Sequence, residues 1–150
     1  MHGMRLLGLA LVALLTGCAA QKPALPADPT KEPWYGETVG QLVQLNREAE
    51  NDFQSGKRDE AGALVEKGQP LMNRLLDVSH PTLEAAEAAS DLDDLYGRML
   101  LTNHHYGWAR LFFQKNLARW KHWQPQTDET ERRRKLADSR IAEVDKHLVD

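Results

Sequence analysis

Apolar residues recur every three or four positions from residue 34 onward, which is the period of a helix with one buried face. This spacing predicts five helices, and clusters of Gly, Pro and Asn between them predict the turns. Alternating β-branched runs and Asn-Gly or Asp-Gly hairpin turns do not occur in the sequence, so no strands are expected. We therefore predict an all-α domain over 34–150. Its helices are expected at about 37–55, 59–76, 82–102, 107–123 and from 127 or 128 onward.

Local signals refine these helix boundaries. Asp59 is a candidate N-cap for the second helix, and Gly68 and Pro70 are expected to kink or interrupt that helix. The spacing of Asp128 and Glu131 predicts a variant of the capping box at the start of the last helix. The last helix is expected to close the core with one apolar face, formed by Leu136, Ala137, Ile141, Val144 and Leu148.

The region 82–123 allows two arrangements. Its apolar spacing continues without a break from Leu92 to Trp120, which is compatible with a single helix of about 40 residues and roughly 60 Å. Asn103 and Gly107, however, flank a natural break. We favour a hairpin, because a helix of that length is unusual in a small domain.

Small residues recur near the expected turns. Gly56 lies five positions before Ala61, and Gly97 lies twelve before Ala109, with Phe113 four positions later. These spacings resemble the turn, small-residue and aromatic positions of the tetratricopeptide repeat, and this resemblance implies stacked helical hairpins.

The match to the repeat is irregular. The two alanines lie 48 residues apart, whereas the repeat has a period of about 34. Val65 stands where the first unit would have its aromatic residue, and His104 stands where the second would have its turn glycine. The prediction is therefore a set of hairpins similar to the repeat, or an irregular helical bundle.

The first 20 residues carry an export pattern. Arg5 precedes an apolar run from Leu6 to Leu15, which is too short for a transmembrane helix of roughly 20 residues. The run ends in Leu15-Thr16-Gly17-Cys18, which resembles the lipobox of bacterial lipoproteins. The resemblance implies that 1–17 is a signal peptide and that Cys18 becomes acylated and serves as a lipid anchor.

The residues after Cys18 bear on location. Ala19 occupies the position where Asp would favour the inner membrane in many Gram-negative lipoproteins, so the resemblance implies the periplasmic face of the outer membrane. The proline-rich segment 18–33 is expected to be a semi-extended tether. The alternative is ordinary signal cleavage after Ala20. Cys18 is the only cysteine, so no disulfide within the chain is possible.

The net charge and the absence of known catalytic motifs exclude several classes of function. The net charge of −3, or about −4 without the signal peptide, does not suit a nucleic-acid-binding protein. The sequence has no Gly-x-Ser-x-Gly elbow and no phosphate-binding glycine loop. We therefore expect a protein that is not an enzyme and has no cofactor.

The segment 103–123 is the densest in aromatic residues and allows three interpretations. The aromatic side chains can form the core of the domain. They can instead form an exposed aromatic and basic strip that binds a protein partner or an envelope glycan. In the third interpretation, His104, His105 and Trp108 bind a metal ion or a small ligand, although no recognisable set of metal ligands is present. The strip would consist of Trp108, Phe112, Arg119 and Trp123.

Two charged groups have simpler explanations. Asp91, Asp93 and Asp94 lack the glycine and distal glutamate of a calcium loop, so we expect a solvated helix face. Arg132–Arg134 can contact anionic head groups, but a charged outer face beside Glu129 and Glu131 explains them as well. The leading expectation is a lipid-anchored helical adaptor that binds a protein partner. The alternative is a lipoprotein that binds a small ligand or a metal ion.

Overall fold

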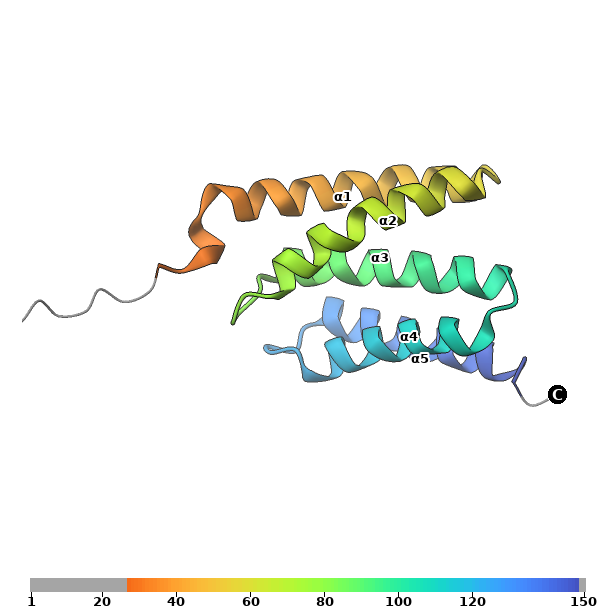
Figure 1. Ribbon diagram of the computed structural model, residues 1–150. Helices are drawn as coiled ribbons and strands as arrows, with labels where there is room; N and C mark the ends of the chain where they lie inside the picture. Colours follow the sequence, from red (N-terminus) through yellow and green to blue (C-terminus); the bar gives the residue numbers. More distant parts are fainter. Residues whose placement is uncertain (1–26, 149–150) are drawn as a thin grey trace, which may run out of the picture.

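The computed structural model describes residues 27–148 and confirms the all-α prediction (Figure 1). Within this range every regular element is helical. The elements are η1 (Pro29–Lys31), α1 (Pro33–Gln54), α2 (Arg58–Leu76), α3 (Leu83–Thr102), α4 (Tyr106–His122) and α5 (Asp128–Asp145). None of the helices described in 27–148 combines the length and the apolar character needed to cross a bilayer.

Helix α3 is the centre of the molecule. The α1–α2 hairpin packs on one side of α3, and α4 packs on the other side with α5 beside it (Figure 1). The larger hydrophobic cluster joins α1, α2 and α3. A smaller cluster of Ala109, Phe113 and Val144 joins α4 and α5. The described part of the chain is thus a stack of helical hairpins with α5 closing one end.

The structure confirms a hairpin, rather than one long helix, in the region 82–123. Helix α3 ends at Thr102 and α4 begins at Tyr106. His104 has φ of 62° and reverses the chain, a conformation that costs a residue other than glycine roughly 1–2 kcal/mol. The amide of His105 donates to the carbonyl of Leu100 (2.8 Å) and closes the helix end.

The α1–α2 turn has the same geometry as the α3–α4 turn. Gly56 has φ of 78°, and the amide of Lys57 donates to the carbonyl of Asp52 (2.8 Å). These bonds span the same number of residues as the His105–Leu100 bond, as in the Schellman ending of a helix. Ala61 follows Gly56 as Ala109 follows His104, and both alanines are fully buried.

The first helix begins earlier than predicted, at Pro33 rather than near residue 37. Proline suits the first turn of a helix because its missing N–H would have no partner there. Tyr35, in the same turn, is almost fully buried. Its hydroxyl donates to the carbonyl of Leu75 and accepts from the amide of Thr82, both at 3.2 Å. This bridge fixes the start of α1 against the end of α2 and the start of α3.

The predicted tether is partly folded. Residues Pro29–Lys31 form η1, which packs against α1, and the side chain of Asp28 accepts from the amide of Thr30 at 3.1 Å. The expectation of an extended segment up to residue 33 is therefore wrong for these residues. Cys18 and the signal peptide lie outside the described residues.

The predicted N-cap of α2 is wrong, and the interruption named as one of two effects of Gly68 and Pro70 does not occur. Its N-cap is Lys57, and Asp59 lies inside the first turn, where a carboxylate interacts favourably with the helix dipole. The helix also continues through Gly68 and Pro70 without interruption. Gly68 is buried, and a Cβ there would lie 3.2 Å from the side chain of Leu92. The apolar burial along this face outweighs the roughly 3 kcal/mol cost of an interior proline.

Helix α5 starts where predicted but is capped differently. Thr127 is the N-cap, and its partner in the capping box is Thr130 rather than the expected Asp128–Glu131 pair. On the predicted apolar face, Ala137 and Val144 are buried and Ile141 is partly buried. Leu136 and Leu148 are 40% and 48% exposed, so their assignment to the core is wrong.

Candidate partner-binding site

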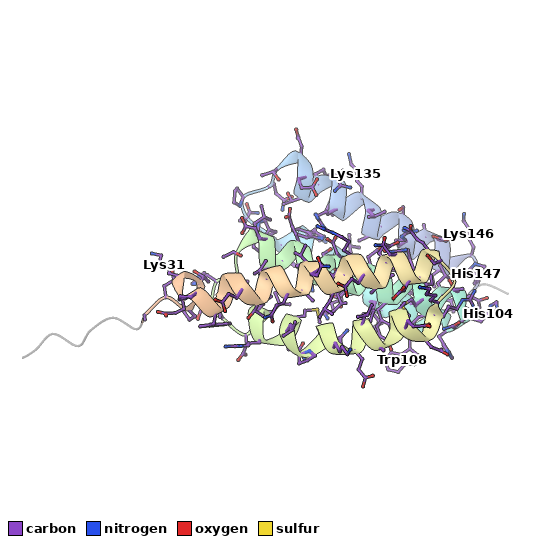
Figure 2. All side chains as sticks on the ribbon, turned by 90° about the horizontal axis from the view of Figure 1, so that it is seen from above. Lys31, His104, Trp108, Lys135, Lys146 and His147 are labelled. Carbon is purple, nitrogen blue, oxygen red and sulfur yellow. The ribbon has the colours of Figure 1, made fainter. Side chains whose placement is uncertain are left out.

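Trp108 is the most exposed large hydrophobic side chain in the described part of the chain. Its exposed fraction is 62%, and it lies toward the end of the molecule opposite Lys31 (Figure 2). Trp108 borders an open pocket of about 410 Å³, a volume within the usual range of ligand pockets. The pocket is lined by Tyr96, Leu100, His105, Trp108 and Phe112. We call it the Trp108 pocket.

Two helices and the turn between them build the Trp108 pocket. Tyr96 comes from α3 and Phe112 from α4, and their rings meet edge to face with centroids 4.8 Å apart. Such a contact stabilises both rings beyond their burial. His105 is the N-cap residue of α4, and its side chain makes no capping hydrogen bond. The ammonium of Lys115 lies 5.7 Å from the centre of the Phe112 ring and adds a positive charge near the pocket.

The structure brings together two of the four residues of the predicted strip. Trp108 and Phe112 both line the pocket. Trp123 is partly buried, and its ring lies 6.0 Å from that of the fully buried Trp120. The side chain of Arg119 is only 11% exposed and is held by an internal ion pair. Core packing and an exposed aromatic site therefore occur in different parts of the same helix.

Asp93, the ion-pair partner of Arg119, was expected on a solvated helix face, and this expectation is wrong. Its side chain is fully buried rather than solvated. Arg119 donates to one carboxylate oxygen at 2.8 Å, and Lys115 donates to the other at 3.0 Å. A buried carboxylate requires such partners because an unpaired charge is very costly away from water. The neighbouring Asp91 and Asp94 form ion pairs on the other side of α3.

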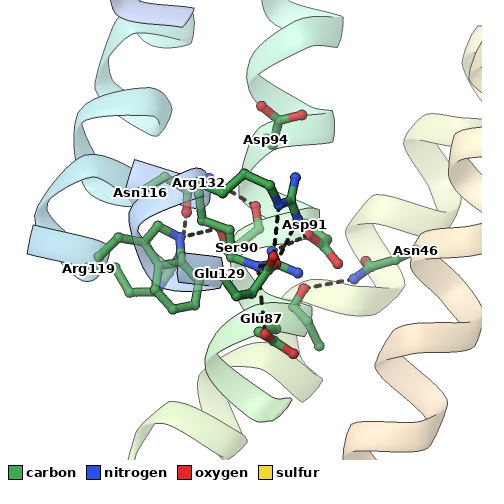
Figure 3. A network of polar contacts seen from close by, with 12 residues as sticks. Asn46, Glu87, Ser90, Asp91, Asp94, Asn116, Arg119, Glu129 and Arg132 are labelled. Carbon is green, nitrogen blue, oxygen red and sulfur yellow. Dashed lines mark hydrogen bonds and ion pairs between the residues drawn. The ribbon is translucent and has the colours of Figure 1, made fainter. Parts of the chain in front are cut away.

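A buried polar network holds α1 and α4 against α3 (Figure 3). The amide of Asn46 donates to the carbonyl of Ala88 at 2.7 Å, and the amide of Asn116 donates to the carbonyl of Ser90 at 2.9 Å. The indole N–H of Trp120 donates to the hydroxyl of Ser90 at 2.8 Å. Because leaving a buried polar group without a partner is costly, these hydrogen bonds hold α1 and α4 in place against α3.

Arg133 connects α5 to α3. It donates to Asp91 and to Glu129, both at 2.7 Å, and its guanidinium lies 5.4 Å from the centre of the Trp120 ring. Its side chain is only 14% exposed. Arg133 therefore helps to fix α5 against α3, and its assignment to a charged outer face is wrong.

Arg132 and Arg134 do form the predicted charged outer face. Arg132 pairs with Glu129 at 2.6 Å, and Arg134 pairs with Glu131 at 2.7 Å. Hydrogen bonds from Arg132 and Arg133 lower the pKa of Glu129 to about 2. The hydrogen bond from Arg134 likewise lowers the pKa of Glu131 to about 2. These arginines are engaged within the helix and are not a free basic patch.

A second cavity of about 340 Å³ lies between α1 and α3. Its central ion pair joins Arg98 to Glu50, and Arg98 also donates to Asp94 at 2.8 Å. Burial raises the pKa of Glu50, but the hydrogen bonds from Arg98 and Gln54 outweigh it and leave the pKa below its usual value. Arg140 of α5 also donates to Asp94 at 3.3 Å, so two arginines balance the two carboxylates and the ion pairs join α1 to α3. The cavity is lined by Val43, Asn46, Arg47, Glu50, Asp91, Asp94, Leu95 and Arg98.

The two adjacent histidines contact different groups. His104 Nδ1 lies 2.7 Å from the hydroxyl of Tyr106, and the Tyr106 ring stacks on His147 with centroids 4.6 Å apart. His105 lines the Trp108 pocket instead. Over residues 27–148 no group of three or more His, Cys, Asp or Glu side chains is arranged to hold a metal ion.

Comparison with protein-family models, curated proteins and solved structures finds no match to this chain. The chemistry of the Trp108 pocket and the sequence pattern around Cys18 are therefore the features of the chain that bear on its function. The pocket offers aromatic and aliphatic surface, the imidazole of His105, and a nearby ammonium group on Lys115. Such a lining is suited to binding an apolar group.

Proposed function

We propose that this protein is a non-catalytic, lipid-anchored lipoprotein of the cell envelope that binds a protein partner through the Trp108 pocket. The observation that supports it most is the exposed Trp108 beside an apolar pocket. Tryptophan is enriched among the residues that dominate binding energy at protein interfaces, especially where it borders a well-packed pocket. The helical hairpins would act as the adaptor that holds this pocket in place.

The anchor half of the proposal depends on Cys18. Two or more acyl chains bind a membrane stably, whereas one chain binds only marginally. The sequence from Cys18 to the start of η1 would span roughly 3 Å per residue where it is extended, enough to hold the domain away from the bilayer. Ala19 stands where Asp would favour the inner membrane in many Gram-negative lipoproteins, so its presence favours the outer membrane. Trp108 lies away from the η1 end of the domain (Figure 2), so the pocket would remain accessible.

The lining of the pocket supports binding rather than catalysis. Its five residues include no nucleophile paired with a base and no carboxylate. His105 supplies the only imidazole among them. Nucleophilic catalysis requires a nucleophile activated by a base within hydrogen-bonding distance, and the lining contains no such pair.

We expect a photoreactive benzophenone amino acid at position 105 to crosslink a protein partner in intact cells. Position 105 is exposed and lines the pocket, and its native side chain makes no capping bond, so the substitution should not disturb the fold. The adduct should disappear when Trp108→Ala is added, because the anchor side chain is then missing. Immunoblotting of the irradiated cells measures the adduct.

The matched control carries the same photoreactive residue at position 111. Leu111 is 51% exposed on the same helix but does not line the pocket. An adduct at 105 that survives Trp108→Ala, or equal adducts at 105 and 111, would show that the Trp108 pocket is not the binding site. No adduct with any protein at position 105 would contradict the proposed function.

A further inference from the structure

The ion cluster beside the Trp108 pocket carries one positive charge in excess. Asp93 is a single carboxylate, but both Arg119 and Lys115 donate to it. Arg119 is 11% exposed, whereas the side chain of Lys115 is 46% exposed. The buried pair Asp93–Arg119 neutralises itself, so the surplus charge is presented to solvent by Lys115. Its ammonium lies 5.7 Å from the Phe112 ring, which lines the pocket.

The rest of α4 has the same sign of charge. The helix contains Arg110, Lys115, Arg119 and Lys121 and no acidic residue, although the whole chain has a net charge of −3. None of the residues that line the pocket is acidic. The absence of acidic residues from the first turn also leaves the positive end of the helix dipole without compensation. The pocket is therefore an apolar hollow without acidic lining residues, and the half-exposed ammonium of Lys115 lies beside its Phe112 wall.

From this complementarity we propose that the Trp108 pocket binds an acidic segment of a protein. A bulky apolar side chain of that segment enters the pocket between Trp108 and Phe112, and a neighbouring carboxylate pairs with Lys115. The proposal rests on the proposed function and names the chemistry of the partner. Complementary charge at the rim favours the correct partner and speeds its association, while the apolar side chain supplies most of the affinity.

The observations favour a protein segment over an anionic membrane surface. Recognition of anionic lipids through basic clusters typically uses about 4–8 Lys or Arg side chains. On α4, Arg110 pairs with Asp145 and Arg119 with Asp93, which leaves Lys115 and Lys121 as the main exposed cations. The apolar surface is also a hollow that suits an inserted side chain, and the exposed Leu111 lies outside it.

The test is selection from a library of random dodecapeptides displayed on phage. The bait is the chain from residue 18 with Cys18→Ser, since every described helix and both hydrophobic clusters lie after that residue. Selected peptides should be enriched in Asp and Glu next to Leu, Phe or Trp. Trp108→Ala should weaken a selected peptide at least about tenfold. Lys115→Gln should weaken it about threefold or more at low salt and less at high salt.

Leu111→Ala and Lys121→Gln are the matched controls, since both residues are exposed on α4 and neither lines the pocket. Both should leave peptide affinity unchanged. Enrichment of neutral or basic peptides, or an affinity insensitive to Lys115→Gln, would overturn the inference. So would binding to phosphatidylglycerol vesicles that depends equally on Trp108 and Leu111, which would indicate a membrane surface. A crosslinked partner in cells whose binding segment is not acidic would reject this inference and leave the proposed function intact.

Discussion

Replacing Asp93 by Ala is expected to lower the free energy of unfolding by about 3 kcal/mol or more. Asp93 is fully buried, and its carboxylate is the partner of both Arg119 and Lys115. Lys115 can turn to solvent after the substitution, but Arg119 is too enclosed to do so. The loss therefore comes mainly from a guanidinium left buried without its counter-ion. Urea denaturation followed by far-UV circular dichroism measures the change.

Asp91→Ala is the matched control for Asp93→Ala. Asp91 lies on the same helix and also pairs with an arginine, but its side chain is 54% exposed. Exposed ion pairs contribute about 0–1 kcal/mol, so its removal should change stability by less than about 1 kcal/mol. If both substitutions lowered the free energy of unfolding equally, the burial of Asp93 would not be the reason that its ion pairs stabilise the fold.

The second large effect is expected for Gly97→Ala, where α3 packs closely against the Phe113 ring of α4. A Cβ on Gly97 would lie 2.5 Å from Cε1 and 2.8 Å from Cζ of Phe113. Phe113 is fully buried, so its ring cannot move aside without disturbing the smaller cluster. Overpacking of this kind costs about 1–3 kcal/mol, and sometimes more. We expect a loss of about 2 kcal/mol after the gain in helix propensity is included.

Two further variants isolate the cause. Gly40→Ala lies inside α1 with nothing within 4 Å of the added Cβ, so it should stabilise the protein by about 0.5–1 kcal/mol. Adding Phe113→Leu to Gly97→Ala should reduce the penalty of the alanine, because the smaller side chain leaves room for it. A Gly97→Ala variant as stable as the parent protein would contradict this close contact between α3 and α4.

Helix periodicity was sufficient to predict the class of fold. The hairpin at 103–105 was also predictable, because Asn103 and Gly107 weaken the helix between two strongly apolar segments. The spacing of Gly97, Ala109 and Phe113 implied a helical hairpin, and the structure places Gly97 against the Phe113 ring. These are local signals, in which neighbouring residues determine the backbone or one face of a helix.

Contacts between distant residues were not predictable in this way. Asp93, Asp91 and Asp94 are nearly adjacent in sequence, and nothing local indicates that Asp93 alone faces α4. The same limit explains the prediction for Arg119, whose position beside Trp108 and Phe112 on one side of α4 suggested an exposed strip. Its ion pair becomes visible only when α3 and α4 are packed together. The absence of any acidic residue from α4 was the local signal that Lys115 carries positive charge beside the pocket.

Lipid labelling with membrane fractionation tests the central claim, that Cys18 anchors this domain in the envelope, most directly. Cells that make the parent chain are compared with cells that make Cys18→Ser, both grown with a labelled fatty acid. The account predicts that the parent chain carries the label and fractionates with the outer membrane, and that Cys18→Ser loses both properties. A Cys18→Ser chain that keeps the label and its membrane location would contradict the anchor and the adaptor function proposed from it.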